Sequence, residues 1–172
     1  MKRISKKMES AAVAASPANK LARGIANNNP LNIRKSEWNW RGKKRNGSDP
    51  AFEQFHATCY GLRAAIIILT RYVTGTSKVN PKPAKTVEEI IHRWAPNGDG
   101  ANNEKVYVDF VVRKAGFLTN EVEPDTSWLF RLLGAMCYME SNYVLTETMF
   151  YMGYSMVPPF VQDFWGEYKI EY

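Results

Sequence analysis

Two stretches of this sequence carry side chains that suit sugar chemistry. In the first, Gly24 to Arg34, three consecutive asparagines precede a proline. Asparagine competes for backbone hydrogen bonds, and proline disfavours the α conformation of the residue before it, so a turn is predicted here. Leu31 and Ile33 alternate with Asn32 and Arg34, which predicts two buried anchors with polar side chains pointing the other way. Amides both donate and accept hydrogen bonds, as sugar hydroxyls and N-acetyl groups require. An Asx-turn cluster that only caps neighbouring backbone fits the same residues.

The second stretch is Glu140-Ser141, at the end of a predicted apolar helix. The partial negative charge of a helix C-terminus disfavours an ionised carboxylate at that position. A carboxyl group that holds its proton near neutral pH is suited to donate it to a glycosidic oxygen. The alternative for Glu140 is an ordinary solvated helix end.

The elements that must position these stretches are predicted to be mostly helical. Apolar periodicity indicates helices at about residues 60–74, 87–94, 104–115 and 127–139. We expect the last three helices to be capped by Thr86 with Glu89, by Asn102 or Asn103, and by Thr126. Gly75 and Gly116 are expected to end the first and third helices. The alternation Phe52-Glu53-Gln54-Phe55 predicts a short strand or extended edge.

Length and charge set the domain organisation. A chain of 172 residues with 45% hydrophobic residues can bury one sizeable core. Residues 1–50 hold twelve Lys and Arg against three Asp and Glu, and the remainder holds eleven against fourteen. This imbalance favours a polyanionic partner for the first third. We expect a basic arm at 1–19, a main domain at 20–142 and an aromatic segment at 143–172 that packs on the core or on a partner.

The sequence lacks the residues that several classes of functional site require. Cys59 and Cys137 are predicted to be buried free thiols, and the two histidines are far apart in the sequence, which argues against a zinc site or a nucleophilic triad. The segment Asn97 to Gly100 matches a calcium loop in composition only. We therefore expect no metal and no cofactor. The longest apolar run, Ala64 to Leu69, is too short to span a bilayer, so no membrane span is expected.

Seven short blocks, taken in order, resemble a family of small phage and prophage proteins. The blocks are Arg23-Gly24-Ile25, Asn27 to Arg34, Trp40-Arg41-Gly42, Phe52 to Phe55, Tyr60 to Ala64, Arg93 to Pro96 and Asn102-Asn103. Members of this family are common in Bacteroidetes phages, are often labelled structural proteins, and are thought to be related to the lysozyme and lytic transglycosylase superfamily. The resemblance covers about residues 23 to 142.

The resemblance implies a mainly α (α+β) fold, a lysozyme-like helical domain with a small β element, that acts on or binds peptidoglycan. Lytic transglycosylases have a helix that ends in Glu-Ser before a short strand. Here Glu140-Ser141 follows the Phe52 to Phe55 strand, so the order implies a circular permutation. Glu140 is the first candidate for the acid, and Glu53 is the second. A transglycosylase needs no second carboxylate, whereas a hydrolase does.

The residues expected to line the glycan cleft are Asn28, Asn29, Asn32, Arg34, Gln54, Tyr60, Arg63 and Asn103, with Trp40 or Trp94 stacking on a sugar. As an exposed amide of this cleft, Asn32 is expected to tolerate alanine within about 1 kcal/mol of stability. The expected location is the virion, with action in the host cell envelope. The competing hypothesis is a non-enzymatic virion protein that binds glycan, or that contacts nucleic acid, capsid or other virion proteins through its basic first third and aromatic end.

Overall fold

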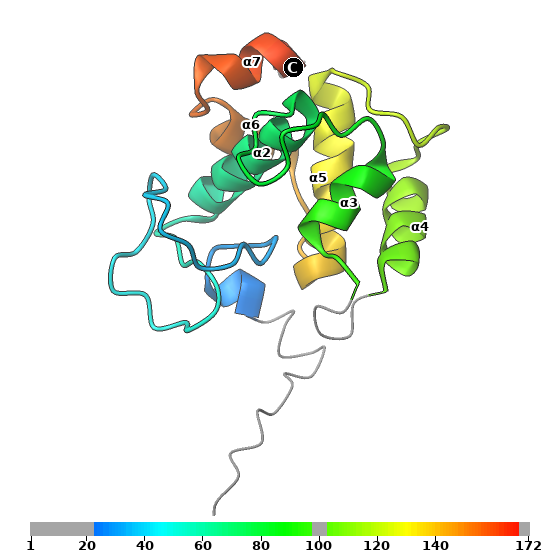
Figure 1. Cartoon of the computed structure of the whole chain (residues 1–172). Coiled ribbons are helices and arrows are strands. Elements are labelled where there is room, and N and C mark those ends of the chain that lie inside the picture. Colours follow the sequence, from blue (N-terminus) through cyan, green and yellow to red (C-terminus); the bar gives the residue numbers. More distant parts are fainter. Residues whose placement is uncertain (1–22, 98–102, 169–172) are drawn as a thin grey trace, which may run out of the picture.

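Helices packed around a single hydrophobic core make up most of the computed structural model, which describes residues 23–97 and 103–168 (Figure 1). They are α2 (Thr58–Thr74), α3 (Val87–Trp94), α4 (Glu104–Ala115), α5 (Thr126–Ser141), α6 (Glu147–Tyr154) and α7 (Pro159–Trp165). Isolated antiparallel bridges join Arg34 to Phe52, Lys43 to Phe55 and Thr86 to Glu121. The prediction of a mainly α fold with a small β element is confirmed. The predicted arm, Asn102 and residues 98–100 of the calcium-like segment lie outside the described residues.

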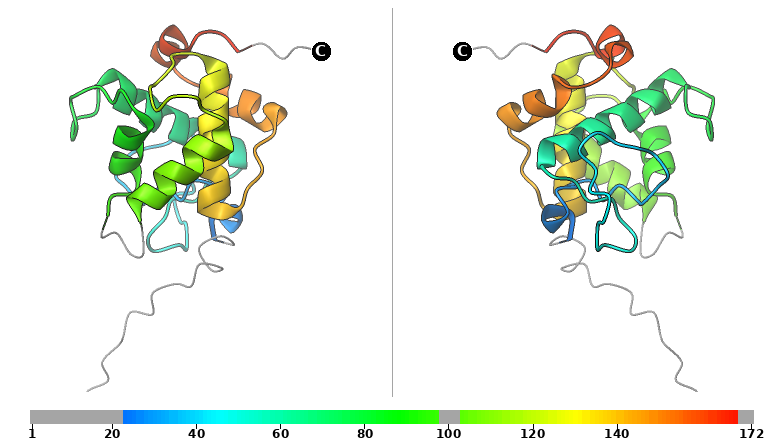
Figure 2. Two further views of the ribbon diagram at one scale, coloured as in Figure 1. Left: turned by 90° about the vertical axis from the view of Figure 1, so that its right-hand side faces the viewer. Right: turned by 90° about the vertical axis from the view of Figure 1, so that its left-hand side faces the viewer.

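Helix α5 is the element around which the others gather, as the two views of Figure 2 show. Its apolar face is fully buried, with Trp128, Leu129, Leu132, Leu133 and Met136 each showing no exposed surface. Helix α4 packs on α5, α3 packs on α4, and α6 and α7 pack on α2. The C-terminal end of α5 is thereby enclosed by other elements, which matters for Glu140.

The ends of α5 differ from the prediction. Asp125 caps the helix, because its Oδ1 accepts from the Trp128 N–H at 2.9 Å, and Thr126 is already the first helical residue. Prediction of Thr126 as the cap was wrong, since the carboxylate one position earlier takes the capping role. At the other end the helix continues through Ser141 and stops at Asn142, whose φ is 52°. Glu140 therefore lies inside the last helical turn.

The other predicted helix ends agree with the structure. The Glu89 N–H donates to Thr86 Oγ1 at 3.1 Å, and the Val106 N–H donates to Asn103 Oδ1 at 3.1 Å. Gly75 and Gly116 follow α2 and α4 with φ of 70° and 68°. These local signals depend on a few neighbouring residues only, which is why they can be read from the sequence.

The aromatic end of the chain packs against the same core. Phe150, Tyr154 and Trp165 are buried. The Trp165 indole stacks on Trp128 with centroids 5.9 Å apart, and its Nε1–H donates to Thr70 Oγ1 at 2.9 Å. Among the described residues, no helix is both long enough and apolar enough to cross a bilayer. Cys59 and Cys137 are free and buried, as predicted.

Candidate functional site

Residues 23–26 are helical, so the turn predicted from Gly24 onward begins later than expected. Within this helical piece, Gly24 closely approaches the end of α5. A Cβ atom on Gly24 would lie 2.8 Å from Ser141 Cβ and 3.0 Å from Asn32 Oδ1. Glycine lets this short helical piece lie directly against the last turn of α5.

The asparagine turn itself follows, and two of its amides serve the backbone. Asn28 has a φ of 52°, and its amide donates to the Phe55 carbonyl at 3.0 Å. Asn29 has no exposed surface, donates to the carbonyls of Ile33 and Glu53 at 3.0 Å each, and accepts from the Ile33 N–H at 2.9 Å. These contacts match the alternative interpretation of the turn as an Asx cluster that holds its own backbone.

Asn32 differs from its neighbours, because its amide reaches α5. Leu31 and Ile33 are buried anchors, as predicted, but Asn32 is also only 7% exposed. Its Nδ2 donates to the Glu140 carbonyl at 3.1 Å and to Glu140 Oε2 at 3.2 Å. The predicted alternation of buried and outward side chains is therefore wrong at Asn32, since the end of α5 covers the polar side of the turn.

Glu140 lies where three segments meet. Its side chain is 4% exposed, its Oε2 accepts from Asn32, and its Oε1 accepts from the Tyr107 hydroxyl of α4 at 3.1 Å. The neighbouring Ser141 hydroxyl donates to the Pro30 carbonyl at 2.7 Å. Glu140 and Ser141 thus join α5 to α4 and to the asparagine turn.

Tyr107 is the site residue that sequence reasoning missed. The pattern placed it only on the inner face of its helix, as a core residue. Burial first, and then the nearby Glu140 charge, raise the pKa of Tyr107 well above its ordinary value. The hydroxyl therefore stays protonated throughout the physiological pH range and donates a hydrogen bond to Glu140 Oε1. The sequence could have indicated this contact, because a tyrosine on the buried face of a helix needs a polar partner for its hydroxyl.

Glu53, the second candidate acid, has a different environment. It is 1% exposed, and its Oε1 accepts from the Ser36 N–H at 2.9 Å, the Ser36 hydroxyl at 3.0 Å and Lys43 Nζ at 2.9 Å. Three donors, one of them charged, converge on one oxygen. This arrangement describes a buried counter-ion that fixes the 34–43 segment.

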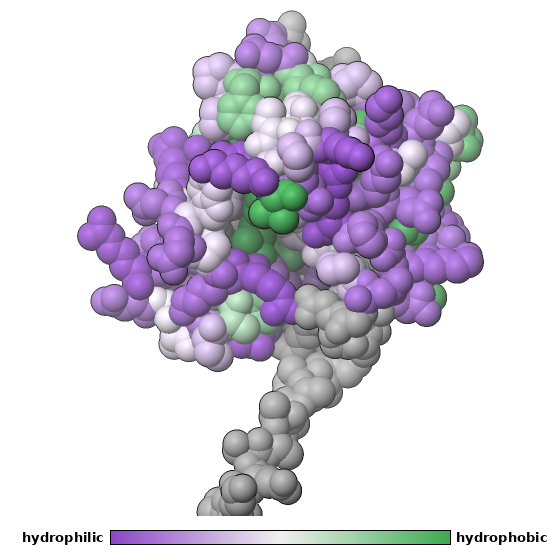
Figure 3. Space-filling model, viewed as in Figure 1, coloured by the Kyte–Doolittle hydropathy of each residue, from purple (hydrophilic) through white to green (hydrophobic). Residues whose placement is uncertain are grey.

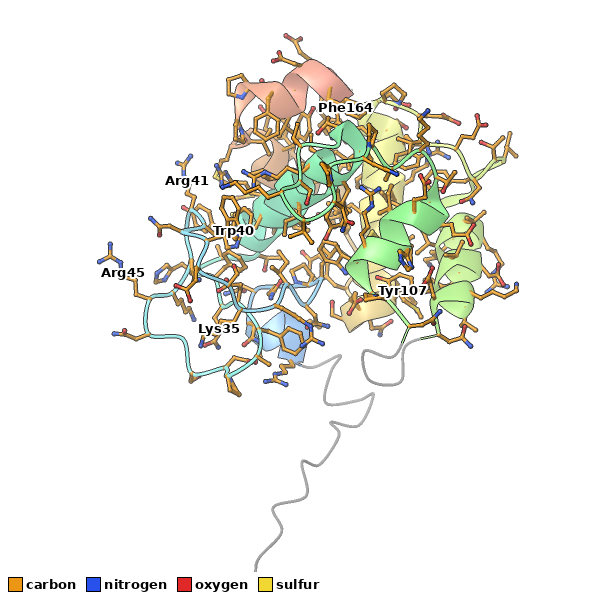
Figure 4. All side chains as sticks on the ribbon, viewed as in Figure 1. Lys35, Trp40, Arg41, Arg45, Tyr107 and Phe164 are labelled. Atoms are coloured by element: carbon orange, nitrogen blue, oxygen red, sulfur yellow. The ribbon has the colours of Figure 1, made fainter. Side chains whose placement is uncertain are left out.

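The remaining predicted binding residues are spread over the molecule. Trp40 is 8% exposed and stacks on Trp38, which is 47% exposed, with centroids 5.8 Å apart. Figure 4 shows Trp40 well separated from Tyr107. The structure places the other members as follows: Arg34 lies over the Phe52 ring, Gln54 bonds Asn27 and the Asp49 N–H, Tyr60 packs on Gly42, Arg63 donates to the Met156 carbonyl, Trp94 packs on the core, and Asn103 caps α4.

The stability expected for Asn32→Ala changes, because Asn32 is buried and its backbone has a left-handed conformation. Asn32→Ala is expected to lower the free energy of unfolding by about 2 kcal/mol, since alanine at positive φ costs about 1–2 kcal/mol and a net hydrogen bond is worth about 1 kcal/mol. Asn32→Gly removes the amide but keeps the backbone conformation, so it should lose only the hydrogen-bond part. Chemical denaturation of both variants measures the difference. Equal losses in the two variants would contradict a backbone contribution.

Residues 23–97 and 103–168 contain no group of three His, Cys, Asp or Glu side chains placed to hold a metal ion. Glu140 combines a buried carboxyl group with a phenol and an amide that both donate hydrogen bonds to it.

Comparison with known proteins gives one informative relative. No family model matches the chain. Protein P5 of Pseudoalteromonas phage PM2 is 34% identical over 127 residues, which cover 72% of this chain and 74% of the relative.

Proposed function

We propose that this chain, which belongs to the family of Protein P5 of Pseudoalteromonas phage PM2, cleaves the glycan strands of peptidoglycan with Glu140 as the general acid. In this proposal it resides in the virion and acts in the host cell envelope.

The observation that carries the proposal is the environment of Glu140. A general acid must hold its carboxyl group in a fixed orientation toward the bond that it protonates. Glu140 is 4% exposed in the last turn of α5. The Tyr107 hydroxyl and the Asn32 amide fix the orientation of its two oxygens. Burial together with fixed orientation supports a catalytic role.

The reaction proposed is a lytic transglycosylation. Glu140 donates its proton to the glycosidic oxygen between N-acetylmuramic acid and N-acetylglucosamine, and the bond from that oxygen to the anomeric carbon breaks. The muramic 6-hydroxyl oxygen then bonds to the anomeric carbon and returns its proton to the Glu140 carboxylate. The Oε2 contact with Asn32, at 3.2 Å, is longer than the Oε1 contact with Tyr107, at 3.1 Å, and is the one that a glycosidic oxygen would replace.

This reaction leaves a product that identifies it. The purified full chain, incubated with peptidoglycan, is expected to release soluble muropeptides with 1,6-anhydro ends, which mass spectrometry distinguishes from reducing ends. Reducing ends would instead indicate hydrolysis, which requires a second carboxylate or a positioned water. Absence of any product from several peptidoglycans would contradict the enzymatic proposal.

A second candidate function is a non-enzymatic virion protein that binds glycan. The observation that favours it is that the hydrogen bonds of Glu140 and Ser141 also tie three segments together, which is useful without any chemistry. Co-sedimentation with peptidoglycan in the absence of product release is the result expected for this function.

A further inference from the structure

The loop at residues 41–46 concentrates positive charge without matching acids. Arg41, Lys44 and Arg45 make no ion pair with any acidic group among residues 23–97 and 103–168. The two buried acids of this region, Asp49 and Glu53, are already paired with other cations, Arg23 and Lys43. The three loop cations therefore remain available to an external anion.

These cations border a hollow in the surface. The hollow has a volume of about 450 Å³ and is lined by Lys43, Lys44, Arg45, Asn46 and His56. The Lys43 ammonium group is turned away, since it donates to the carbonyls of Ser36 and Trp38 as well as to Glu53. Lys44, Arg45, Asn46 and His56 thus supply side chains able to donate hydrogen bonds to a ligand in the hollow.

A further cation lies beside the loop. Burial first, and then the charge of the neighbouring Arg41, lower the pKa of Arg63, which places the two guanidinium groups near each other. In Figure 4, Arg41 and Arg45 point outward from the body of the molecule on this side. The same side of the molecule is strongly hydrophilic in Figure 3.

We propose that this hollow, with its rim of Arg41, Lys44 and Arg45, binds the phosphodiester backbone of nucleic acid without regard to base sequence. Phosphates recur along a nucleic-acid strand, so one phosphate can enter the hollow while its neighbours contact the cations of the rim. Arginine and lysine are the usual partners of backbone phosphates. This site is separate from Glu140 and does not depend on glycan cleavage.

The test compares two matched double variants of the full chain. Lys44→Gln with Arg45→Gln removes two cations at the hollow, and Arg113→Gln with Lys114→Gln removes two exposed cations from the last turn of α4. Both variants change the net charge equally. Binding of a fluorescent 20-base-pair DNA duplex is measured by anisotropy over a series of salt concentrations.

Each lost phosphate contact lowers the slope of log affinity against log salt concentration by about 0.9. The hollow variant should therefore lose about 1.8 in slope and bind at least tenfold more weakly at low salt, while the α4 variant should match the wild type. Equal behaviour of the two variants, or loss of binding to anionic phosphatidylglycerol vesicles without loss of DNA binding, would overturn the proposal. Circular dichroism and melting curves confirm that both variants are folded.

Discussion

Glu140→Gln is expected to lower the rate of muropeptide release by a factor of about 100 to 10,000, the usual contribution of general acid catalysis. Glutamine keeps the size of the side chain and can still accept from the Tyr107 hydroxyl, but it has no proton to give to the glycosidic oxygen. The fold should survive the change, at some cost in stability, because the glutamine NH2 group meets the Asn32 Nδ2 donor in place of Oε2. Chromatography of released muropeptides measures the rate, and a melting curve checks the fold.

Two matched variants make this experiment decisive. Glu147→Gln changes the same functional group on an exposed residue in the first turn of α6 and should release muropeptides at the wild-type rate. Glu53→Gln tests the rival acid, and its expected defect is in stability, because it removes the buried partner of Lys43. Full activity of Glu140→Gln with a folded but inactive Glu53→Gln would transfer the catalytic role to Glu53.

Tyr107→Phe separates orientation from proton donation. The phenylalanine ring fills the same space, but the hydrogen bond to Glu140 Oε1 is lost. If Tyr107 positions the acid, the rate should fall less than in Glu140→Gln, and the pH profile of the remaining activity should shift. A smaller rate with an unchanged pH profile would indicate that the hydroxyl acts through stability alone.

The parts of the fold that were predicted correctly depend on local sequence. Thr86, Asn103, Gly75 and Gly116 mark helix ends through contacts with residues a few positions away, and apolar periodicity located the helices that they bound. Asp125 was missed because two adjacent residues could both cap the helix, and the sequence does not decide between them.

The candidate site depends on contacts that no local pattern reveals. Asn32 and Glu140 are 108 positions apart, and Tyr107 lies 33 positions from Glu140. The sequence marked Asn32 and Glu140 separately by residue type, but only the packing of α5 against α4 and the asparagine turn brings them together. Trp40 shows the same limit, since it was expected to stack on sugar and instead is buried beneath the exposed Trp38.

Asp49 is a second contact centre that sequence reasoning did not identify, and it carries the largest stability prediction. Its carboxylate accepts from Arg23 Nη2 at 2.6 Å and from Asn27 Nδ2 at 2.7 Å. It also accepts from the backbone N–H groups of Ala51 and Phe52 at 2.9 Å each. One buried carboxylate thus joins the helical piece at residues 23–26 and the asparagine turn to the bridge region around Phe52.

Asp49→Ala is expected to lower the free energy of unfolding by about 3 kcal/mol, the low end of the cost of breaking a buried ion pair, because the Arg23 side chain is 29% exposed. Arg23 and Asn27 lose their acceptor, and two backbone N–H groups lose theirs. Asp109→Ala is the control, because its pair with Lys105 is exposed on one helix and should contribute little. Denaturation of both variants at pH 7 measures the difference, and a small loss in Asp49→Ala would show that the neighbouring hydrogen bonds hold this region without it.

The same residue predicts how stability depends on pH. Burial alone would raise the pKa of Asp49, but hydrogen bonds from Arg23, Asn27 and the backbone outweigh it and hold the pKa well below the ordinary range. Because the pKa is lower in the folded chain than in the unfolded chain, the stabilisation is complete above the unfolded value of about 4. It is lost as the pH falls from there toward the folded pKa. The stability difference between wild type and Asp49→Ala should therefore shrink when denaturation is repeated at pH 4, 3 and 2, and a difference that stays constant over this range would contradict the assigned role of the carboxylate.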